Sequence, residues 1–157
     1  MTTKRQEGFS LIELLSVVAI IGIIAAIAIP NLLASRRAAN EGSAQSSMRT
    51  LHSSQAVYQA TKGDGKFGTL TNLKDNDLID SNLGGGTKSG YTFACTPDDT
   101  TNPVNFFCAA HPTDVNAITR TGHRSFTITE SGILRSKVQD TDPANWAAAV
   151  TWTPMGN

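Results

Sequence analysis

Residues 9–29 read FSLIELLSVVAIIGIIAAIAI, and this stretch decides the fold. Its single ionisable residue is Glu13. As a helix the stretch would be about 31 Å long, which matches a bilayer hydrocarbon core about 30 Å thick. A domain of this size could not surround so apolar a helix on every face. The sequence therefore predicts a transmembrane helix over residues 9–30.

A cleaved secretory signal peptide is the main alternative for this segment. Lys4 and Arg5 would supply its basic start, but a small-residue cleavage site should then follow the apolar stretch. Instead the chain continues as Pro30-Asn31-Leu32-Leu33-Ala34, and the helical pattern runs on. Cleavage there would cut a structural element in two, so we expect the segment to stay attached.

The eight residues from Gly8 to Leu15, GFSLIELL, begin a familiar motif that continues from Val17 to Pro30. The motif resembles the N-terminal signature of type IV pilins and type II secretion pseudopilins. Its one visible departure is Ser10, where threonine is commoner. A carboxylate inside an apolar span costs about 2.5–3.5 kcal/mol at mid-membrane, so its presence at this point makes the motif specific.

The resemblance implies a role for each matching residue. Residues 1–8 would be a leader that prepilin peptidase removes after Gly8, and the new N-terminal Phe9 would be methylated. Glu13 would be the family's buried glutamate, which pairs with Phe9 of a neighbouring subunit during assembly. Gly22 and Pro30 would be the helix-weakening positions.

Orientation and partners also follow from the resemblance. Lys4 and Arg5 precede the apolar stretch, and Arg36 and Arg37 follow it. Because the two sides carry equal numbers of basic residues here, the positive-inside rule barely favours either orientation. The resemblance implies a cytoplasmic leader and a globular domain outside the bacterial inner membrane. Its implied partners are membrane lipid before assembly, an ATP-driven inner-membrane assembly machinery, and further copies of this chain or other pilins in a filament.

The helix is expected to continue over residues 31–62. Ala44, Met48, Leu51 and Tyr58 form an apolar stripe at helical spacing, which polar Gln55 interrupts. Gly63 is a natural helix stop. Pro30 should kink the helix, because it removes a backbone donor and crowds the preceding turn.

The remaining residues, 63–157, predict a connecting loop and a small antiparallel sheet. Residues 63–90 are rich in Gly, Asp, Asn and Lys and indicate the loop. Four short β-rich segments follow: Tyr91–Cys95, Val104–Ala109, Arg124–Glu130 and Ile133–Val138. A long helix followed by such a sheet is an α+β fold. The resemblance implies the same fold, with the second half of the helix packed along the sheet.

Cys95 and Cys108 are the two cysteines of the chain, in neighbouring predicted strands. The non-cytoplasmic compartment implied above is oxidising, so we expect a disulfide. Closing so short a loop stabilises a fold by about 3 kcal/mol in the chain-entropy model. The alternative is a pair of buried free thiols.

Composition and motifs offer little support for other functions. The 13 basic and 13 acidic residues balance, without a block of like charge, so we expect no nucleic-acid partner. Gly63 to Gly68 matches G-x-G-x-x-G, but it follows a helix and leads into a loop, which predicts a turn. Two groups of aspartates are too incomplete to form a calcium loop: Asp75, Asp77 and Asp80, and Asp140 and Asp142. His52, His111 and His123 are dispersed. We therefore expect no cofactor, no metal and no catalytic site.

The sequence predicts a structural subunit of a type IV pilus-like filament. A pseudopilin of a type II secretion system would carry the same motif. A membrane-anchored enzyme or binding domain would need a constellation of polar residues that the sequence does not contain. An adhesin-like minor pilin is a third alternative, and the filament's biological role is open.

Overall fold

The computed structural model describes residues 8–138, 142–143 and 145–156. The chain divides into two compact units, Met1–Ser35 and Arg36–Asn157, and helix α1 (Leu11–Thr61) runs through both. The other elements, in chain order, are α2 (Leu70–Asp75), α3 (Ser81–Gly84), β1 (Thr87–Lys88), β2 (Tyr91–Asp98), β3 (Asn105–Pro112), β4 (Ser125–Thr129), β5 (Arg135–Lys137), α4 (Trp146–Ala149) and β6 (Thr153–Pro154). The predicted α+β class is confirmed.

The described part of the first unit is a helix with an apolar surface. Among the described residues, α1 is the one helix long and apolar enough to cross a membrane, and its apolar window has no buried residue. The large apolar side chains left exposed in this unit are Phe9, Leu11, Ile12, Leu14, Leu15, Val17, Val18, Ile20, Ile21, Ile23, Ile24, Ile27, Ile29 and Leu32. Such a continuous apolar surface marks a contact with lipid or with other protein.

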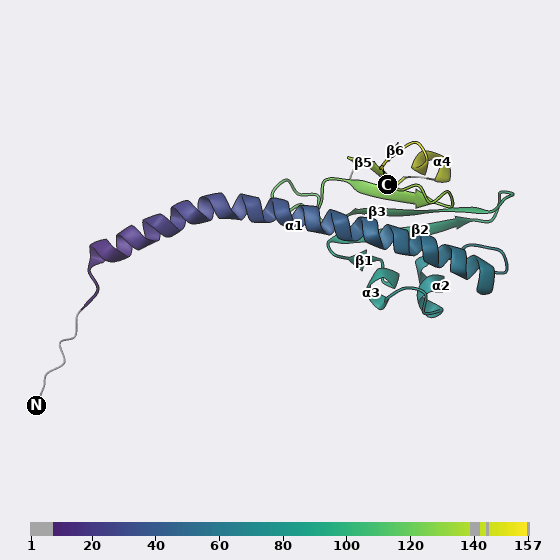
Figure 1. Cartoon of the computed structure of the whole chain (residues 1–157), viewed down its shortest axis with the longest axis horizontal. Helices are drawn as coiled ribbons and strands as arrows, with labels where there is room; N and C mark the ends of the chain where they lie inside the picture. The colour runs from purple at the N-terminus through teal and green to yellow at the C-terminus, as the bar shows by residue number, and fades with distance from the viewer. Residues whose placement is uncertain (1–7, 139–141, 144, 157) are drawn as a thin grey trace, which may run out of the picture. The chain divides into compact units, whose positions relative to one another are not determined.

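The second unit is built on an antiparallel sheet whose strand order is β1-β2-β3-β4-β5-β6 (Figure 1). Neighbouring strands are also consecutive strands of the chain, as in a meander, with α4 (Trp146–Ala149) between β5 and β6. Ser131 and Gly132 form the predicted tight turn between β4 and β5, where Gly132 has a φ of 71° and donates its N–H to Thr129 O. A positive φ at this position is easily reached only by glycine.

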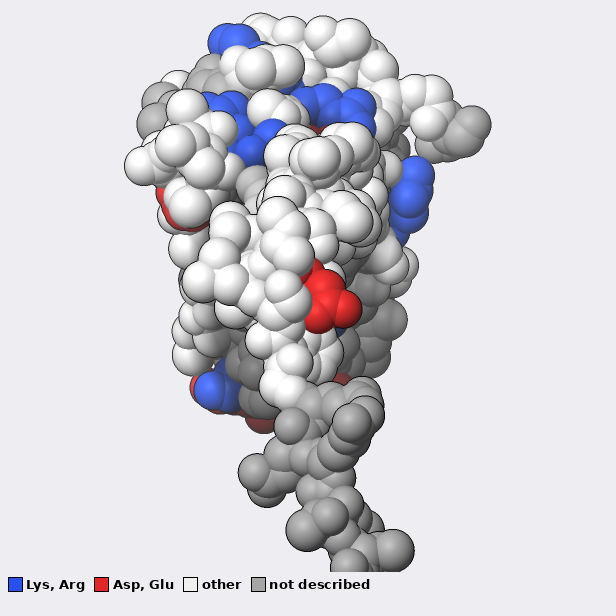
Figure 2. Space-filling model, turned by 90° about the vertical axis from the view of Figure 1, so that its left-hand side faces the viewer, with Lys and Arg blue, Asp and Glu red and all other residues white. Residues whose placement is uncertain are grey.

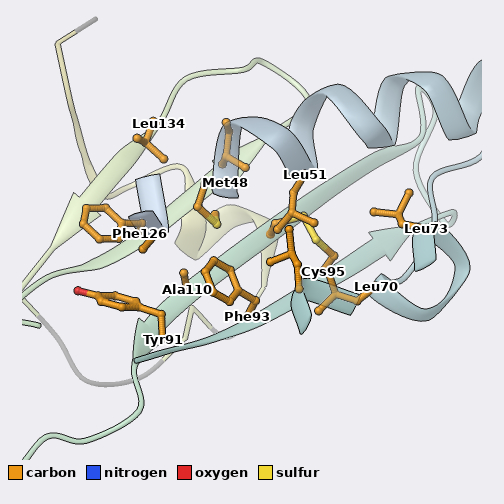
Figure 3. Close-up of a cluster of buried hydrophobic side chains, with 14 of the residues drawn as sticks. Met48, Leu51, Leu70, Leu73, Tyr91, Phe93, Cys95, Ala110, Phe126 and Leu134 are labelled. Atoms are coloured by element: carbon orange, nitrogen blue, oxygen red, sulfur yellow. A yellow bond between two sulfur atoms is a disulfide. The ribbon is translucent and has the colours of Figure 1, made fainter. Parts of the chain in front are cut away.

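One face of the sheet packs against the second half of α1. Ala44, Met48 and Leu51 are fully buried, as the predicted apolar stripe requires. They meet inward-facing residues of β2, β3 and β4, including Tyr91, Phe93, Cys95, Ala110, Phe126 and Ile128 (Figure 3). Alternate residues of β2 point into this core because side chains on a strand alternate between its faces.

The opposite face of β3 and β4 is covered by the C-terminal segment. Ala109 and Thr127 are buried there, and Thr127 donates its hydroxyl to Ala149 O of α4 at 3.2 Å. Trp152 is also buried. Because both faces are covered, every residue of β4 is buried, and the sheet is the middle of three layers in the second unit.

Two expectations about the sheet domain were wrong in detail. Over the residues that the structure describes, the sheet has six strands rather than four, because β1 and β6 add a short strand at each edge. Each added strand has two residues, too few for an alternating pattern in the sequence. The four predicted strands all occur, with shifted ends.

Residues 63–90 are also not a simple connecting loop, because they contain α2, α3 and β1. Both helices have local start signals. Thr69 and Asn72 form a capping box at α2, and Asp80 accepts the N–H groups of Asn82 and Leu83 at α3. Leu70, Leu73 and Leu83 are buried and tie the segment to the core.

Candidate assembly site

Glu13 lies in the first turn of α1, where it bonds to the chain's own backbone. Ser10 N donates to Glu13 Oε2 at 3.0 Å, and Leu14 N donates to Ser10 O at 3.2 Å. Ser10 therefore occupies the N-cap position, and Glu13 reaches back to it as in a capping box. The spacing Ser-x-x-Glu was visible in the sequence, but this local role of Glu13 was missed. In the single subunit the carboxylate thus has one backbone donor and remains exposed.

Gly22 and Pro30 both lie inside α1, and residues 23–29 between them are helical in this structure. Pro30 has no N–H, so the carbonyl of Ala26 lacks its usual helical donor. One residue further on, Asn31 Nδ2 donates to Ile27 O at 3.0 Å, which gives the carbonyl next to this gap a side-chain donor. A Cβ at Gly22 would meet nothing within 4 Å in the subunit, so packing within the subunit does not require glycine here.

The second unit holds its own ion pair at the start of the helical half that packs on the sheet. Glu41 is buried and accepts His123 N at 2.8 Å. It also accepts Arg124 Nε at 2.9 Å and lies 2.8 Å from Arg124 Nη2. Both guanidinium nitrogens thus contact Glu41 Oε2, and Glu41 Oε1 accepts the hydrogen bond from His123 N. The arrangement fixes the segment before β4 to α1 and has the character of a structural contact.

Tyr91 of β2 contacts the same segment before β4, where its hydroxyl donates to Arg124 O at 2.8 Å. Burial, helped by the nearby Glu41 carboxylate, raises the pKa of Tyr91 well above its ordinary value. A raised phenol pKa stabilises the fold below the pKa of the unfolded chain, and this stabilisation is lost as the pH rises through the folded pKa.

Alkaline titration should therefore show one tyrosine whose ionisation coincides with unfolding. We expect Tyr91 to stay protonated above pH of about 10, the ordinary tyrosine value, for as long as the fold persists. Tyrosinate absorbance followed together with circular dichroism measures both events. The Tyr91→Phe variant should lack the late absorbance change, and an unchanged late phase in that variant would contradict the assignment.

Two carboxylates on the surface of the second unit are held in their charged form. The hydrogen bond from Lys88 lowers the pKa of Asp80, whose Oδ2 is 2.8 Å from Lys88 Nζ. The hydroxyl of Thr119 lowers the pKa of Asp114 in the same way. Both carboxylates organise turns, and neither belongs to a cluster that could bind an ion.

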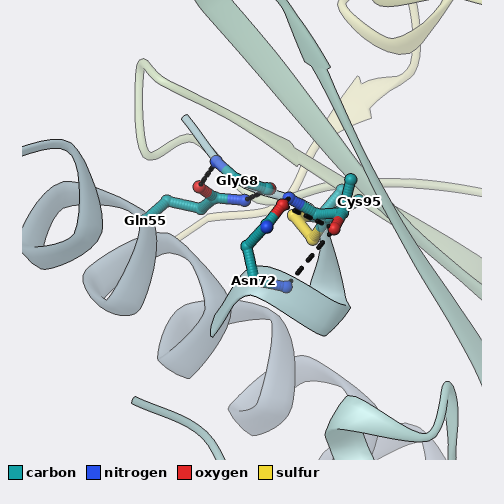
Figure 4. Close-up of a disulfide and its surroundings, with 6 residues drawn as sticks. Gln55, Gly68, Asn72 and Cys95 are labelled. Carbon is teal, nitrogen blue, oxygen red and sulfur yellow. Dashed lines mark hydrogen bonds between the residues drawn. A yellow bond between two sulfur atoms is a disulfide. The ribbon is translucent and has the colours of Figure 1, made fainter. Parts of the chain in front are cut away.

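The disulfide between Cys95 and Cys108 is present, as predicted. The two cysteines face each other directly in the register of β2 and β3. Next to the disulfide, Gln55 of α1 makes two bonds to the backbone of Gly68 (Figure 4). Gln55 Nε2 donates to Gly68 O at 2.5 Å, and Gly68 N donates to Gln55 Oε1 at 2.9 Å. The polar residue that interrupts the apolar stripe is thus fully buried and satisfied.

Other patterns in the sequence have structural explanations. Gly63 to Gly68 forms the predicted turn after α1, with Gly65 at a φ of 82°. Asp80 caps α3, so it is not part of an ion site with Asp75 and Asp77. Within the described residues no group of three potential metal-binding side chains occurs. Of the acids near the C-terminus, Asp140 lies outside the described residues, and Asp142 Oδ1 is 2.8 Å from His111 Nδ1.

Comparison with known proteins identifies the first segment. Residues 3–29 match the family model described as a prokaryotic N-terminal methylation motif. The chain is 31% identical over 102 residues to the type IV narrow pilus major component PilA5 of Thermus thermophilus, a match that covers 64% of this chain and 80% of the relative. The chain belongs to the type IV pilin and pseudopilin family.

Other relatives of this pilin-family chain match a shorter part of it. The type IV major pilin protein PilA of Myxococcus xanthus is 43% identical over 58 residues, which is 37% of this chain and 26% of the relative. The type II secretion system core protein G of Aeromonas hydrophila is 34% identical over 59 residues, which is 38% of this chain and 41% of the relative. The chain thus spans less than half the length of these two relatives. No solved structure matches the chain significantly.

Gly8, Phe9, Glu13, Gly22 and Pro30 all fall on the matched motif or next to its end. The structure brings Glu13 close to Ser10, but it does not bring the two helix-weakening residues near any other site residue. Their predicted roles concern contacts with the peptidase or with other subunits. For this pilin-family chain those roles therefore stand as proposals.

Proposed function

We propose that this chain is a structural subunit of a type IV pilus-like filament. Prepilin peptidase cleaves it after Gly8, Phe9 is methylated, and α1 anchors the subunit in the bacterial inner membrane with the sheet unit on the periplasmic side. The subunit then polymerises with further copies or other pilins. The single observation that carries the proposal is the exposed apolar surface of residues 9–32 with one carboxylate near its start.

Such a surface suits two environments in turn. In the bilayer the apolar side chains face lipid, and in a filament they would face the same segment of other subunits. Lipid tails are as apolar as leucine, so burial alone does not drive the transfer. Close packing of small residues such as Ala25, Ala26 and Ala28 would contribute, together with pairing of Glu13.

Local opening of the helix belongs to the same proposal. Gly22 and Pro30 bound a segment in which helical hydrogen bonds are the easiest to lose, because glycine is flexible and proline removes a donor. We propose that residues 23–29, helical in the subunit, unwind on assembly and let the filament extend. A filament reconstruction with unbroken helix over these residues would contradict this part.

A pseudopilin of a type II secretion system is the second candidate, supported by the similarity to the core protein G of such a system. That match covers 59 residues, or 38% of this chain, whereas the match to the narrow pilus component covers 102 residues, or 64% of this chain. The longer match favours a pilus. An enzymatic role has no supporting cluster of side chains among the described residues.

Processing of the N-terminus tests the proposal directly. Protein extracted from membranes should yield an N-terminal peptide that begins at Phe9 and carries one additional methyl group, measured by mass spectrometry. Cleavage at the membrane face is expected because it leaves the whole anchor attached. An N-terminus beyond Ile29, or a retained Met1, would contradict the proposal.

The Gly8→Val variant supplies the matched control. A Cβ at Gly8 meets nothing within 4 Å in the subunit, so the substitution should not disturb the fold. We expect it to block cleavage and methylation while membrane insertion continues. Normal processing of Gly8→Val would show that the peptidase acts elsewhere.

A further inference from the structure

The loop between β3 and β4, residues 113–124, combines exposed apolar side chains with arginines. We name it the proximal loop. Ile118 is 72% exposed and Val115 is 45% exposed. Single exposed apolar residues are common on proteins, but here two lie in one short loop with arginine side chains beside them. On the face drawn in Figure 2, several Lys and Arg side chains gather among uncharged ones.

Backbone contacts hold the proximal loop against the first turns of α1 in the second unit. Arg37 Nη2 donates to Ile118 O at 3.0 Å, and Arg37 Nε donates to Arg120 O at 3.1 Å. Asn40 Nδ2 donates to Thr121 O at 3.0 Å. Ile118 is therefore kept at the level of Arg37 along the helix.

Hydrogen bonds within the loop also fix the conformation of its exposed tip. Asp114 accepts Asn116 N at 2.9 Å and the hydroxyl of Thr119 at 2.6 Å. Asn116 Oδ1 in turn accepts Ile118 N at 3.1 Å. Both backbone groups of Ile118 are thus engaged, and its side chain is left pointing outward with most of its surface exposed.

The position of Arg36 and Arg37 in the chain limits their distance from the apolar stretch. Arg36 follows Ile29 after about 10 Å of helix, with Leu32 and Leu33 in between. The headgroup layer on each side of a bilayer is about 5–8 Å thick. Arginine side chains on a helix lean toward its N-terminus and keep their charge at the interface while their stems contact apolar surface. The guanidinium of exposed Arg36 can therefore reach lipid phosphates.

We propose that the proximal loop is a membrane-docking surface for phospholipid headgroups in the unassembled subunit. Ile118 lies against the lipid headgroups, and Arg36 contacts the phosphates. A lipid surface is favoured over a second copy because Arg36 is only six residues beyond the membrane segment in the chain, and because arginine with isoleucine suits an anionic interface. The proposal rests on the membrane anchoring proposed above.

Fluorescence quenching in vesicles tests the docking of the proximal loop. The full chain with Ile118→Cys would be labelled with a small fluorophore without reductant, so that Cys95 and Cys108 stay paired. It would be reconstituted into vesicles of phosphatidylethanolamine and phosphatidylglycerol that contain a lipid with a nitroxide headgroup. The matched control is Val57→Cys, an exposed valine of α1 about 30 Å further along the helix from Arg36.

We expect quenching at position 118 that is several-fold stronger than at position 57. Arg36→Gln, or neutral phosphatidylcholine in place of phosphatidylglycerol, should reduce the quenching at 118. Equal or absent quenching at both positions, in protein that floats with the vesicles, would overturn the inference while the anchoring stands. Protein that fails to float would instead overturn the anchoring. Quenching that vanishes in nanodiscs holding one copy would assign the surface to a second subunit and also overturn it.

Discussion

Replacement of Glu13 by alanine is expected to abolish or greatly reduce filaments, while membrane insertion and cleavage after Gly8 continue. In a filament core the carboxylate would be buried, and a buried unpaired charge is not tolerated. The methylated amine of Phe9 on a neighbouring subunit keeps its positive charge and is the partner we propose. Removal of one member of a buried ion pair typically costs about 3–5 kcal/mol. Electron microscopy and the amount of subunit in sheared filaments measure the effect.

The hydrogen bond from Ser10 N to Glu13 calls for a second variant. Glutamine can serve in a capping box as well as glutamate, so Glu13→Gln retains the local helix start but removes the charge. If the charge is the assembly contact, Glu13→Gln should fail to assemble much as Glu13→Ala does. Normal filament numbers with Glu13→Gln would show that Glu13 acts through capping, and normal numbers with both variants would contradict any role in assembly.

Gln55→Leu is expected to destabilise the second unit by about 2–6 kcal/mol, because two buried polar groups lose their partners at about 1–3 kcal/mol each. The sequence pattern suggests the opposite sign, since leucine at this position would complete the apolar stripe of α1. In the structure, the N–H and the carbonyl of buried Gly68 both depend on the Gln55 amide. Urea unfolding followed by circular dichroism should show the lower midpoint.

Gln59→Leu is the matched control, four residues further along the same helix. Gln59 Nε2 donates to Gly65 O at 3.0 Å, but this bond is exposed and water can replace it. We expect a change within about 0.5 kcal/mol, as for most surface substitutions. Equal effects of the two variants, or a more stable Gln55→Leu protein, would show that the amide pair with Gly68 does not hold this loop.

Much of the architecture could be predicted because it follows from short-range patterns. The apolar stripe of Ala44, Met48 and Leu51 repeats at the helical period and is buried as expected. The strands around Cys95 and Cys108 are β-rich and bounded by turn residues, and the disulfide joins them as expected. Such patterns depend on residues within a turn or a strand of each other.

The wrong predictions concern elements that are too short for a helical or strand period to be visible in the sequence. Residues 63–90 look like a loop by composition, yet they contain two short helices, each with a local N-terminal cap. The buried side chains of Leu70, Leu73 and Leu83 attach these helices to the core. The strands β1 and β6 have two residues each, and they form by backbone pairing with β2 and β5, respectively. The covering of the second sheet face by α4 was missed for the same reason.

For the candidate site, the apolar helix, its single carboxylate Glu13 and the motif around Gly8 could be predicted, because these are properties of adjacent residues. The folded structure was needed to show that Gln55 is a buried partner of Gly68 and that Glu41 binds Arg124 across 83 residues of chain. It also shows that Arg37 holds Ile118 at the start of the second unit. Contacts between residues far apart in the chain depend on how the helix and sheet pack, and no local pattern of hydrophobicity records which polar groups that packing brings together.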